Sequence, residues 1–389
     1  MKLIPDIQGN LRSKESMFKE TTFRRRKILF IIGSPNQTSQ MHGVASQLPE
    51  YDCYFSQVYS KNFFIRQAVC SGILDTTIFA GEFRKKADVY LDLHGLRNDY
   101  ARTLYCNRYD MAVLCTDLHV SRDLRQMKTV WVQEGMTDPV TTWGKLTRRL
   151  GLPAYLAMNT AFNGSSNICD VYCAASEGYK RQFGRLGTDL SKIFVTGIPN
   201  YDHAAAYLDN TFPHNGYVLV ATSDIRETFR KDDRSAFIRR CVKIAAGRQM
   251  VFKLHPNEQK ERAIREIRSE APPGALIFTE GNTEHMIANC DELITQYSTV
   301  VYIGIALGKK VHSYFDVEEL EQLAPLQNGG ISASLIADLC RRYLEFRGTK
   351  EEFFRTARIA VPINNLHERE SSAYPCHYSN QEGVYPTAR

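Results

Sequence analysis

Short apolar runs rich in β-branched and aromatic residues alternate with amphipathic stretches along this chain. This alternation is typical of parallel sheets whose strands are connected by helices. A first set of predicted strands covers residues 27–32, 87–93, 111–115, 129–133, 170–174 and 192–196. A second set covers residues 217–221, 249–254, 275–279, 292–297 and 310–314. The pattern therefore predicts two doubly wound sheets, one after the other.

The length of 389 residues exceeds what one hydrophobic core ordinarily holds, so we expect two domains. An irregular polar stretch at 201–216 separates the two sets of strands and is the predicted linker. The predicted organisation is an N-terminal arm at 1–25, a first Rossmann-like domain at 26–200, a second at 217–345, and a C-terminal helix and tail at 346–389. Segments 233–246, 258–270 and 333–357 are predicted to be helical.

The composition excludes several classes of protein. No apolar run approaches the roughly 20 residues that a membrane-spanning helix needs, and the N-terminus lacks the apolar stretch of a secretory signal. We therefore expect a cytoplasmic protein. The net charge of +6 includes basic clusters at 24–27, at 84–86 and around Lys145, Arg148 and Arg149. These clusters permit a peripheral contact with anionic lipid at the inner face of the membrane, whereas no motif indicates nucleic-acid binding.

The ten cysteines are scattered along the chain, and several lie inside apolar runs. That placement favours buried thiols over disulfides. The closest pair, Cys169 and Cys173, has no matching second pair, so the sequence indicates no metal site. The oligomeric state stays open.

Ligands of open α/β sheets bind beyond the carboxyl ends of the strands, so the residues that follow each predicted strand are the candidates. The first such motif is Gln133-Glu134-Gly135. A carboxylate at this edge can act as a general base if it faces a cleft that is partly shielded from water. It can equally be a turn residue that ends the strand.

The second motif is Lys253-Leu254-His255-Pro256. Pro256 ends the strand, and the imidazole of His255 can donate to a phosphate oxygen or protonate a leaving group near neutral pH. Lys253, two residues earlier, would share the face of His255 if the extended geometry persists. A histidine that only caps a turn is the alternative.

The third motif is Tyr297-Ser298-Thr299, which stands before the apolar run 300–307 and Gly308. We expect Ser298 to cap the N-terminus of a helix that Gly308 ends. A helix start preceded by hydroxyl groups can hold an anion such as a phosphate. An ordinary N-cap without a ligand is the alternative.

In this order the three motifs resemble those of bacterial sialyltransferases and Kdo-type capsule transferases. The resemblance implies an α/β protein of the GT-B fold, in which two Rossmann-like parallel-sheet domains face each other across a cleft. It implies an inverting, metal-independent transfer from a CMP-activated ulosonic acid, with no cofactor besides this nucleotide-sugar donor and with a glycan or glycolipid as acceptor. Glu134 would be the base, and His255, Ser298 and Thr299 would bind the donor phosphate. Gln133 departs from the family, which often has a second acid there.

The chain also resembles two related families. The stretch from Lys253 to Pro256 and the segment YSTVVYIGIALGKK are similar to those of CDP-glycerol glycerophosphotransferases. Residues 170–197 resemble UDP-N-acetylglucosamine 2-epimerases, but Asp224 stands where those enzymes have a catalytic histidine. Two interpretations of Arg226 stay open: it faces the donor, or it forms a surface salt bridge.

Further strand-end residues are weaker candidates for lining the cleft: Gly33, Ser34, His94, Asp117 and, for the nucleoside, Glu280 with its neighbours at 279–281. The sequence thus favours a nucleotide-sugar glycosyltransferase. A diverged UDP-sugar 2-epimerase and a non-catalytic nucleotide-sugar-binding protein are the two alternatives.

Overall fold

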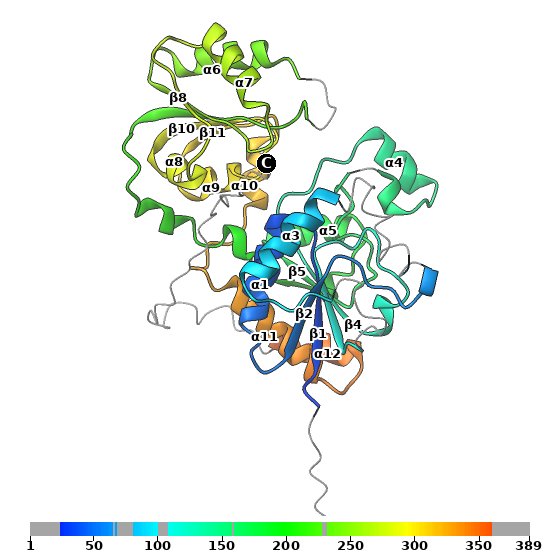
Figure 1. The fold of residues 1–389 in the computed structure, drawn as a ribbon. Helices are drawn as coiled ribbons and strands as arrows, with labels where there is room; N and C mark the ends of the chain where they lie inside the picture. The colour runs from blue at the N-terminus through cyan, green and yellow to red at the C-terminus, as the bar shows by residue number, and fades with distance from the viewer. Residues whose placement is uncertain are drawn as a thin grey trace, which may run out of the picture.

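A computed structural model describes residues 24–64, 67, 81–99, 108–157, 159–227 and 232–359. It consists of two lobes, each built on an open parallel sheet with helices on both faces (Figure 1). The runs of β-branched and aromatic residues form the strands because parallel strands are covered on both sides and must be apolar throughout. The predicted two-domain α/β fold is confirmed.

The first sheet has six parallel strands in the order β2-β1-β3-β4-β5-β6. Their bounds are β1 Lys27–Ile31, β2 Asp52–Ser56, β3 Met111–Leu114, β4 Lys128–Val132, β5 Val171–Ala174 and β6 Ile193–Val195. Helices α1 (Pro35–Ser46) and α3 (Gly81–Leu93) cover one face, and α5 (Glu177–Arg185) covers the other. The strand order reverses at β1, which lies between β2 and β3, and ligands of open α/β sheets bind at such a point.

The second sheet has five parallel strands in the order β11-β10-β7-β8-β9. Their bounds are β7 Tyr217–Ala221, β8 Met250–Lys253, β9 Leu276–Phe278, β10 Cys290–Thr295 and β11 Lys310–His312. Helices α6 (Arg234–Ala245) and α7 (Lys260–Glu270) cover one face, while α8 (Thr283–Asn289) and α9 (Val301–Ala306) cover the other. The strand order reverses between β7 and β10.

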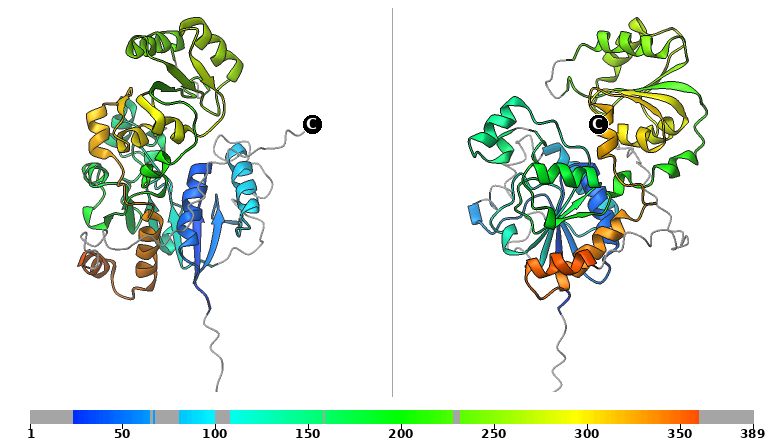
Figure 2. Two further views of the ribbon diagram at one scale, coloured as in Figure 1. Left: turned by 90° about the vertical axis from the view of Figure 1, so that its left-hand side faces the viewer. Right: turned by 180° about the vertical axis from the view of Figure 1, so that it is seen from behind.

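The last two helices return to the first lobe, as the two further views show (Figure 2). Residues Ile336, Cys340 and Tyr343 of α11 (Ser332–Glu345) and Phe353 of α12 (Lys350–Ile359) are buried in the same core as β1 and β3. Lys128 fixes this return by donating hydrogen bonds to three backbone carbonyl groups at 343–346. The sequence prediction had grouped residues up to 345 with the second domain; the structure packs this helix on the first.

The lobes also share a core at the start of α5. Tyr179 and Tyr302 are buried, and their hydroxyl groups lie 2.6 Å apart. Ser176 donates to the carbonyl oxygen of Leu323, which ends helix α10 (Val317–Leu323). A β-carbon at Gly178 would lie 1.9 Å from the carbonyl oxygen of Gln322, so only glycine permits this approach. The contact fixes the two lobes against each other at one end.

One predicted strand is wrong. Segment 87–93 lies in helix α3, where Ala87 and Leu91 are buried against the sheet. Their spacing of four residues places both on one helical face, and Val89 between them is 49% exposed. The predictions missed edge strand β2, whose sequence DCYFS has polar ends. Within the described ranges, no helix combines the length and the apolar character required to cross a membrane.

Candidate functional site

Glu134 lies directly after β4, at the carboxyl edge of the first sheet. Its carboxylate accepts a hydrogen bond from Ser34 Oγ at 3.0 Å and one from Gln37 Nε2 at 2.6 Å. Ser34 follows β1 and caps helix α1 through a capping box with Gln37. The start of α1 therefore holds the carboxylate from one side. A β-carbon at Gly33 would lie 2.5 Å from Gln37 Oε1, so glycine leaves room for this arrangement.

The surroundings of Glu134 favour its protonated form. Burial raises the pKa of this carboxyl group, and the hydrogen bonds from Gln37 and Ser34 offset only part of the rise. Neither donor carries a charge, and no ion pair of Glu134 is found among the described residues. A carboxylate that is costly to ionise accepts a proton readily, which is the property that a general base requires.

A pocket of about 160 Å³ opens beside Glu134. Both lobes contribute to it, because Thr299 of the second lobe lies 3.5 Å from where a β-carbon of Gly135 would be. Tyr201 donates from its hydroxyl group to Thr299 Oγ1 at 2.7 Å and connects the linker to this contact. The lining consists of Asn36, Gln133, Glu134, Gly135, Met136, Thr137, Thr160, Asn163, Asn200, Tyr201 and Thr299. Glu134 and Thr299, which come from different lobes, thus line one pocket.

Gln133 and Asp117 have structural contacts. The amide of Gln133 accepts from the backbone N–H of Ala175 at 2.9 Å and donates to the carbonyl oxygen of Gly135 at 2.8 Å, which fixes the loop that carries Glu134. Asp117 is buried and accepts hydrogen bonds from Gly164, Ser166 and Tyr172. Burial raises the pKa of Asp117 despite these donors. Asp117 holds the loop that presents Asn163 to the pocket instead of lining the pocket itself.

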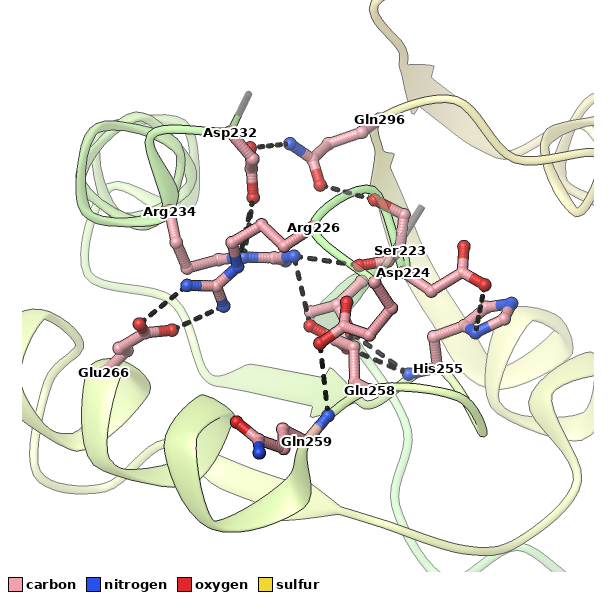
Figure 3. A network of polar contacts seen from close by, with 12 residues as sticks. Ser223, Asp224, Arg226, Asp232, Arg234, His255, Glu258, Gln259, Glu266 and Gln296 are labelled. Carbon is pink, nitrogen blue, oxygen red and sulfur yellow. Dashed lines mark hydrogen bonds and ion pairs between the residues drawn. The ribbon is translucent and has the colours of Figure 1, made fainter. Parts of the chain in front are cut away.

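His255 stands at the carboxyl end of β8, two strands from β10 (Figure 3). Its backbone N–H donates to Thr222 Oγ1, and its ring Nδ1 accepts from the backbone N–H of Asn257 at 3.3 Å. With Nδ1 as the acceptor, the ring proton is on Nε2. Asp224 lies 3.6 Å from Nδ1 and accepts from Asn257 Nδ2 at 3.0 Å. The imidazole is one-third exposed, and the pocket beside Glu134 does not include it.

A buried charged network supports the loop of His255 (Figure 3). Glu258 accepts from the backbone N–H of His255 and from Thr222, and it forms an ion pair with Arg234 at 3.0 Å. Arg234 also pairs with Asp232 at 3.0 Å. The network reaches β10 because Gln296 donates to Asp232 at 2.8 Å. It holds the carboxyl ends of adjacent strands in one fixed arrangement.

Ser223 and Gln296 mark the point where the strand order of the second sheet reverses. Ser223 Oγ donates to Gln296 Oε1 at 2.7 Å, and both side chains are buried. Gln296 lies three residues before Thr299, so the same edge of the sheet extends from the His255 loop to the pocket. Adjacent strands are about 4.8 Å apart, which makes the lateral separation of β8 from β10 about 10 Å.

Two predicted phosphate ligands, Lys253 and Ser298, differ from expectation. Lys253 is buried and donates to the carbonyl oxygen of Leu254, because its face of β8 packs on the core with Val251. Ser298 is not the helix cap; helix α9 is capped by Val300 without a side-chain bond. The carbonyl oxygens of Ser298 and Thr299 accept hydrogen bonds from the backbone N–H groups three residues later, which makes the first turn of this helix tighter than an α-helical turn. Gly308, with a φ of +65°, does end the helix as predicted.

The remaining candidates lie outside the pocket. Arg226 forms a bidentate pair with Glu266 of α7, with both bonds 2.7 Å long, so the salt-bridge alternative applies. His94 follows helix α3 and stacks on Tyr90, which corrects its predicted place at a strand end. Glu280 follows β9 and is 78% exposed, within reach of Lys260 at 3.4 Å. Pro256 lies in the turn that follows His255.

A second cavity, of about 340 Å³, lies beside edge strand β9 and includes Gly281 from the predicted nucleoside segment. Phe212 and Phe278 lie there with their ring centroids 5.5 Å apart. The full lining is Thr211, Phe212, Pro213, Phe278, Gly281, Asn282, His285 and Met286. In the part of the chain that the structure describes, no three His, Cys, Asp or Glu side chains form a group suited to a metal ion.

Sequence reasoning missed most of the other residues that line the pocket beside Glu134. Asn36 follows Ser34 in helix α1, and Thr160 and Asn163 come from a loop with no motif. Asn200 and Tyr201 stand where the linker was predicted to begin, a position between two domains that points to a cleft residue. That position was the only available signal.

Several solved structures are similar to this chain at low sequence identity. A putative UDP-N-acetylglucosamine 2-epimerase from Listeria monocytogenes is 12% identical with a TM-score of 0.51, over 83% of this chain and 98% of that chain. The UDP-GlcNAc 2-epimerase from Neisseria meningitidis bound to UDP-GlcNAc is also 12% identical with a TM-score of 0.51, over 81% and 99%. The wall teichoic acid polymerase TagF is 13% identical with a TM-score of 0.43, over 82% and 89%.

The likeness to the two epimerases confirms the predicted GT-B arrangement of two Rossmann-like domains. Sequence identity near one residue in eight carries no assignment of activity. The sequence matches no protein-family model and no curated protein.

Proposed function

We propose that this protein is an inverting, metal-independent glycosyltransferase that moves a sugar from a nucleotide donor to a glycan or glycolipid acceptor. The observation that carries the proposal is the environment of Glu134. Its carboxylate has only uncharged hydrogen-bond donors and lies in a pocket to which the second lobe contributes Thr299. The donor class, a CMP-activated ulosonic acid, rests on the resemblance of the three motifs to sialyltransferases and Kdo-type transferases.

In the proposed reaction an acceptor hydroxyl group enters the pocket and donates a hydrogen bond to Glu134. Its oxygen attacks the anomeric carbon of the donor, a C–O bond forms, and the proton passes to the carboxylate. The bond between the anomeric carbon and the phosphate oxygen breaks, and its electron pair stays on the phosphate. The raised pKa of Glu134 matches this role because the carboxyl group gains stability when it takes up the proton.

His255 is the proposed partner of the departing phosphate. Its Nε2–H is the free donor of the ring, since Nδ1 accepts from Asn257. A hydrogen bond that strengthens as negative charge develops lowers the barrier. Ser298 and Thr299 are proposed to bind the same phosphate through their hydroxyl groups. The roughly 10 Å between β8 and β10 suits a ligand that extends along the sheet edge.

The nucleoside is proposed to bind at the cavity beside β9, where Gly281 and the residues around Glu280 follow the strand. The rings of Phe212 and Phe278 offer an aromatic surface to a planar base. Binding there would place the phosphate towards β8, because β9 is the neighbour of β8 in the sheet.

The test compares Glu134→Gln with Glu177→Gln, an exposed glutamate at the start of α5. Release of CMP or UDP from nucleotide sugars is measured with a panel of hydroxyl acceptors. We expect Glu134→Gln to lower turnover by about 100-fold or more and Glu177→Gln to leave it within about twofold. Equal turnover of the wild type and Glu134→Gln would refute the assignment of the base.

A second candidate is a nucleotide-sugar 2-epimerase, because residues 170–197 resemble that family and two epimerases share the fold. Such an enzyme exchanges the proton at sugar C2 without an acceptor. Deuterium incorporation from heavy water into UDP-GlcNAc would identify it, and thermal shifts with CMP, CDP and UDP would show which nucleotide stabilises the fold. A non-catalytic binding protein would show the thermal shift without turnover or exchange.

A further inference from the structure

The described residues between Asp138 and Thr160 (138–157, 159 and 160) form an excursion from the first lobe that starts and ends at the pocket beside Glu134. Asp138 and Thr160 close its neck: the backbone N–H of Asp138 donates to Thr160 Oγ1, and the backbone N–H and hydroxyl group of Thr160 donate back to Asp138 Oδ2. Thr137 and Thr160 both line the pocket. The neck of the excursion therefore adjoins the pocket. We refer to residues 138–160 as the α4 excursion.

The α4 excursion exposes an unusual density of large apolar side chains. Fifteen large apolar side chains are exposed in the described part of the chain, and six of them lie between residues 143 and 156. They are 39% to 61% exposed: Trp143, Leu146, Leu150, Leu152, Tyr155 and Leu156. Helix α4 (Thr142–Arg149) buries only Gly144 and Thr147, so most of its surface faces outward.

Hydrogen bonds join the two short helices that carry the apolar surface. Trp143 Nε1 donates to the carbonyl oxygen of Leu156 at 2.9 Å, which joins helix α4 to the short helical turn Ala154–Ala157. Thr141 caps the helix by accepting from Gly144 N–H at 3.0 Å. The indole N–H therefore has a partner already, so removal of this surface from water would leave no unpaired donor at Trp143.

Helix α4 carries positive charge as well as apolar side chains. Lys145, Arg148 and Arg149 are exposed on the same helix, and Asp138 at the neck is the single acidic residue of the excursion. Figure 1 places α4 at the outer tip of the first lobe, on the side towards the second lobe, and the reverse view in Figure 2 agrees. The tip projects away from the cores of both sheets.

From this combination we propose that the α4 excursion docks on a lipid surface that carries anionic headgroups. Tryptophan, tyrosine and leucine side chains enter the boundary between headgroups and acyl chains, while lysine and arginine side chains pair with the headgroup charges. A second copy of the chain fits less well, because a two-fold contact between two such faces would bring cations against cations. Charge complementarity thus selects the anionic lipid surface as the occupant.

Docking at this surface would hold the pocket at the membrane. If the proposed transferase activity is correct, a lipid-linked acceptor would reach Glu134 by moving along the excursion. That consequence rests on the proposed function, whereas the docking itself does not.

The experiment measures sedimentation of the full chain with vesicles of phosphatidylcholine alone or with about one third phosphatidylglycerol. We expect binding to the anionic vesicles that weakens as salt is raised. The variants Leu146→Ser with Leu150→Ser and Arg148→Gln with Arg149→Gln should each lower the partition coefficient by about tenfold or more. The matched controls Leu190→Ser and Arg181→Gln with Arg185→Gln, which change exposed residues elsewhere on the first lobe, should change it by less than about twofold.

Three outcomes would overturn the proposal: no binding to anionic vesicles, binding by both excursion variants that is as strong as that of the wild type, or a vesicle-free dimer that the leucine variant converts to a monomer. The last outcome would assign the face to self-association, and sedimentation velocity would detect it. Circular dichroism and urea titration confirm that each variant is folded. Vesicle binding requires no donor, so loss of the transferase proposal through Glu134→Gln would leave this result unchanged.

Discussion

Glu134 in the first lobe and Glu292 in the second are two glutamates withdrawn from water, with opposite electrostatics. Glu134 has only the uncharged donors Ser34 and Gln37, and burial raises its pKa. Glu292 has a 2% exposed side chain, but His312, Lys310 and Arg248 contact it and outweigh the effect of burial, so its pKa falls to about 2. Residue type and burial alone do not distinguish the two; the charges of the partners do.

The comparison distinguishes a candidate catalytic carboxylate, Glu134, from a carboxylate with a structural role, Glu292. Glu292 joins strand β10 to β11 through Lys310 and His312, and to the end of helix α6 through Arg248. Both oxygens of its carboxylate pair with a cationic side chain, and Glu292 lines neither of the two cavities described above. Glu134 lines a pocket and has lost hydration without gaining an opposite charge. Such an imbalance is characteristic of groups that exchange protons during a reaction.

The largest expected effect on stability comes from Glu292→Gln. The folded pKa is depressed below the unfolded value, so the ion pairs stabilise the protein above pH 4.5 and this contribution is lost as the pH falls towards 2. We expect the variant to lose about 2 kcal/mol of unfolding free energy at pH 7, and the difference to shrink on acidification. Urea unfolding measures it, with the exposed Glu261→Gln as the control. A constant difference across pH would contradict the role given to the partners of the Glu292 carboxylate.

The substitution Glu134→Gln should change the free energy of unfolding in the opposite direction and by a smaller amount. The folded pKa is raised, so the wild-type carboxyl group favours folding most below pH 4.5, and this contribution is lost as the pH rises through the folded pKa. The amide has no charge to bury, and we expect it to stabilise the protein at pH 7 by up to about 1 kcal/mol. Urea titrations at neutral pH and near pH 4 measure the change. A large destabilisation at neutral pH would mean that Glu134, like Glu292, has a structural role.

The smallest effect is expected for Gln37→Leu, which removes one of the two donors to Glu134. Its loss raises the pKa of Glu134 further, because this hydrogen bond lowers the value in the wild type. The acid limb of the pH–rate profile should move to higher pH, and turnover near neutral pH should fall by about a few-fold. Gln47→Leu at the other end of helix α1 is the control. An unchanged pH–rate profile would show that Gln37 does not affect the pKa of Glu134.

The sequence predicted the parts of the site that depend on one strand. Glu134 follows a run of apolar residues, and an apolar run in a doubly wound sheet ends at the ligand-binding edge. The strand Tyr217–Ala221 was predicted with its observed bounds for the same reason. Local patterns failed where one face alone is buried: segment 87–93 was predicted as a strand although Ala87 and Leu91 have helical spacing.

Contacts between distant segments were outside the reach of such patterns. Thr299 meets Gly135 only because the lobes dock through Tyr179, Tyr302 and the close approach at Gly178. Lys253 was predicted to bind a phosphate, but its side chain lies on the core face of β8. The bond between Gln37 and Glu134 joins residues 97 positions apart, and neither residue's neighbours signal it.

The return of helices α11 and α12 to the first sheet has a consequence for synthesis on the ribosome. All six strands of that sheet precede residue 196, yet the helices that complete one of its faces begin at Ser332. The lobe that is translated first is therefore finished last, after the inserted lobe has all its strands. A nascent chain halted before Ser332 would display an uncovered apolar surface, the kind of surface that chaperones bind and that aggregates when they are scarce.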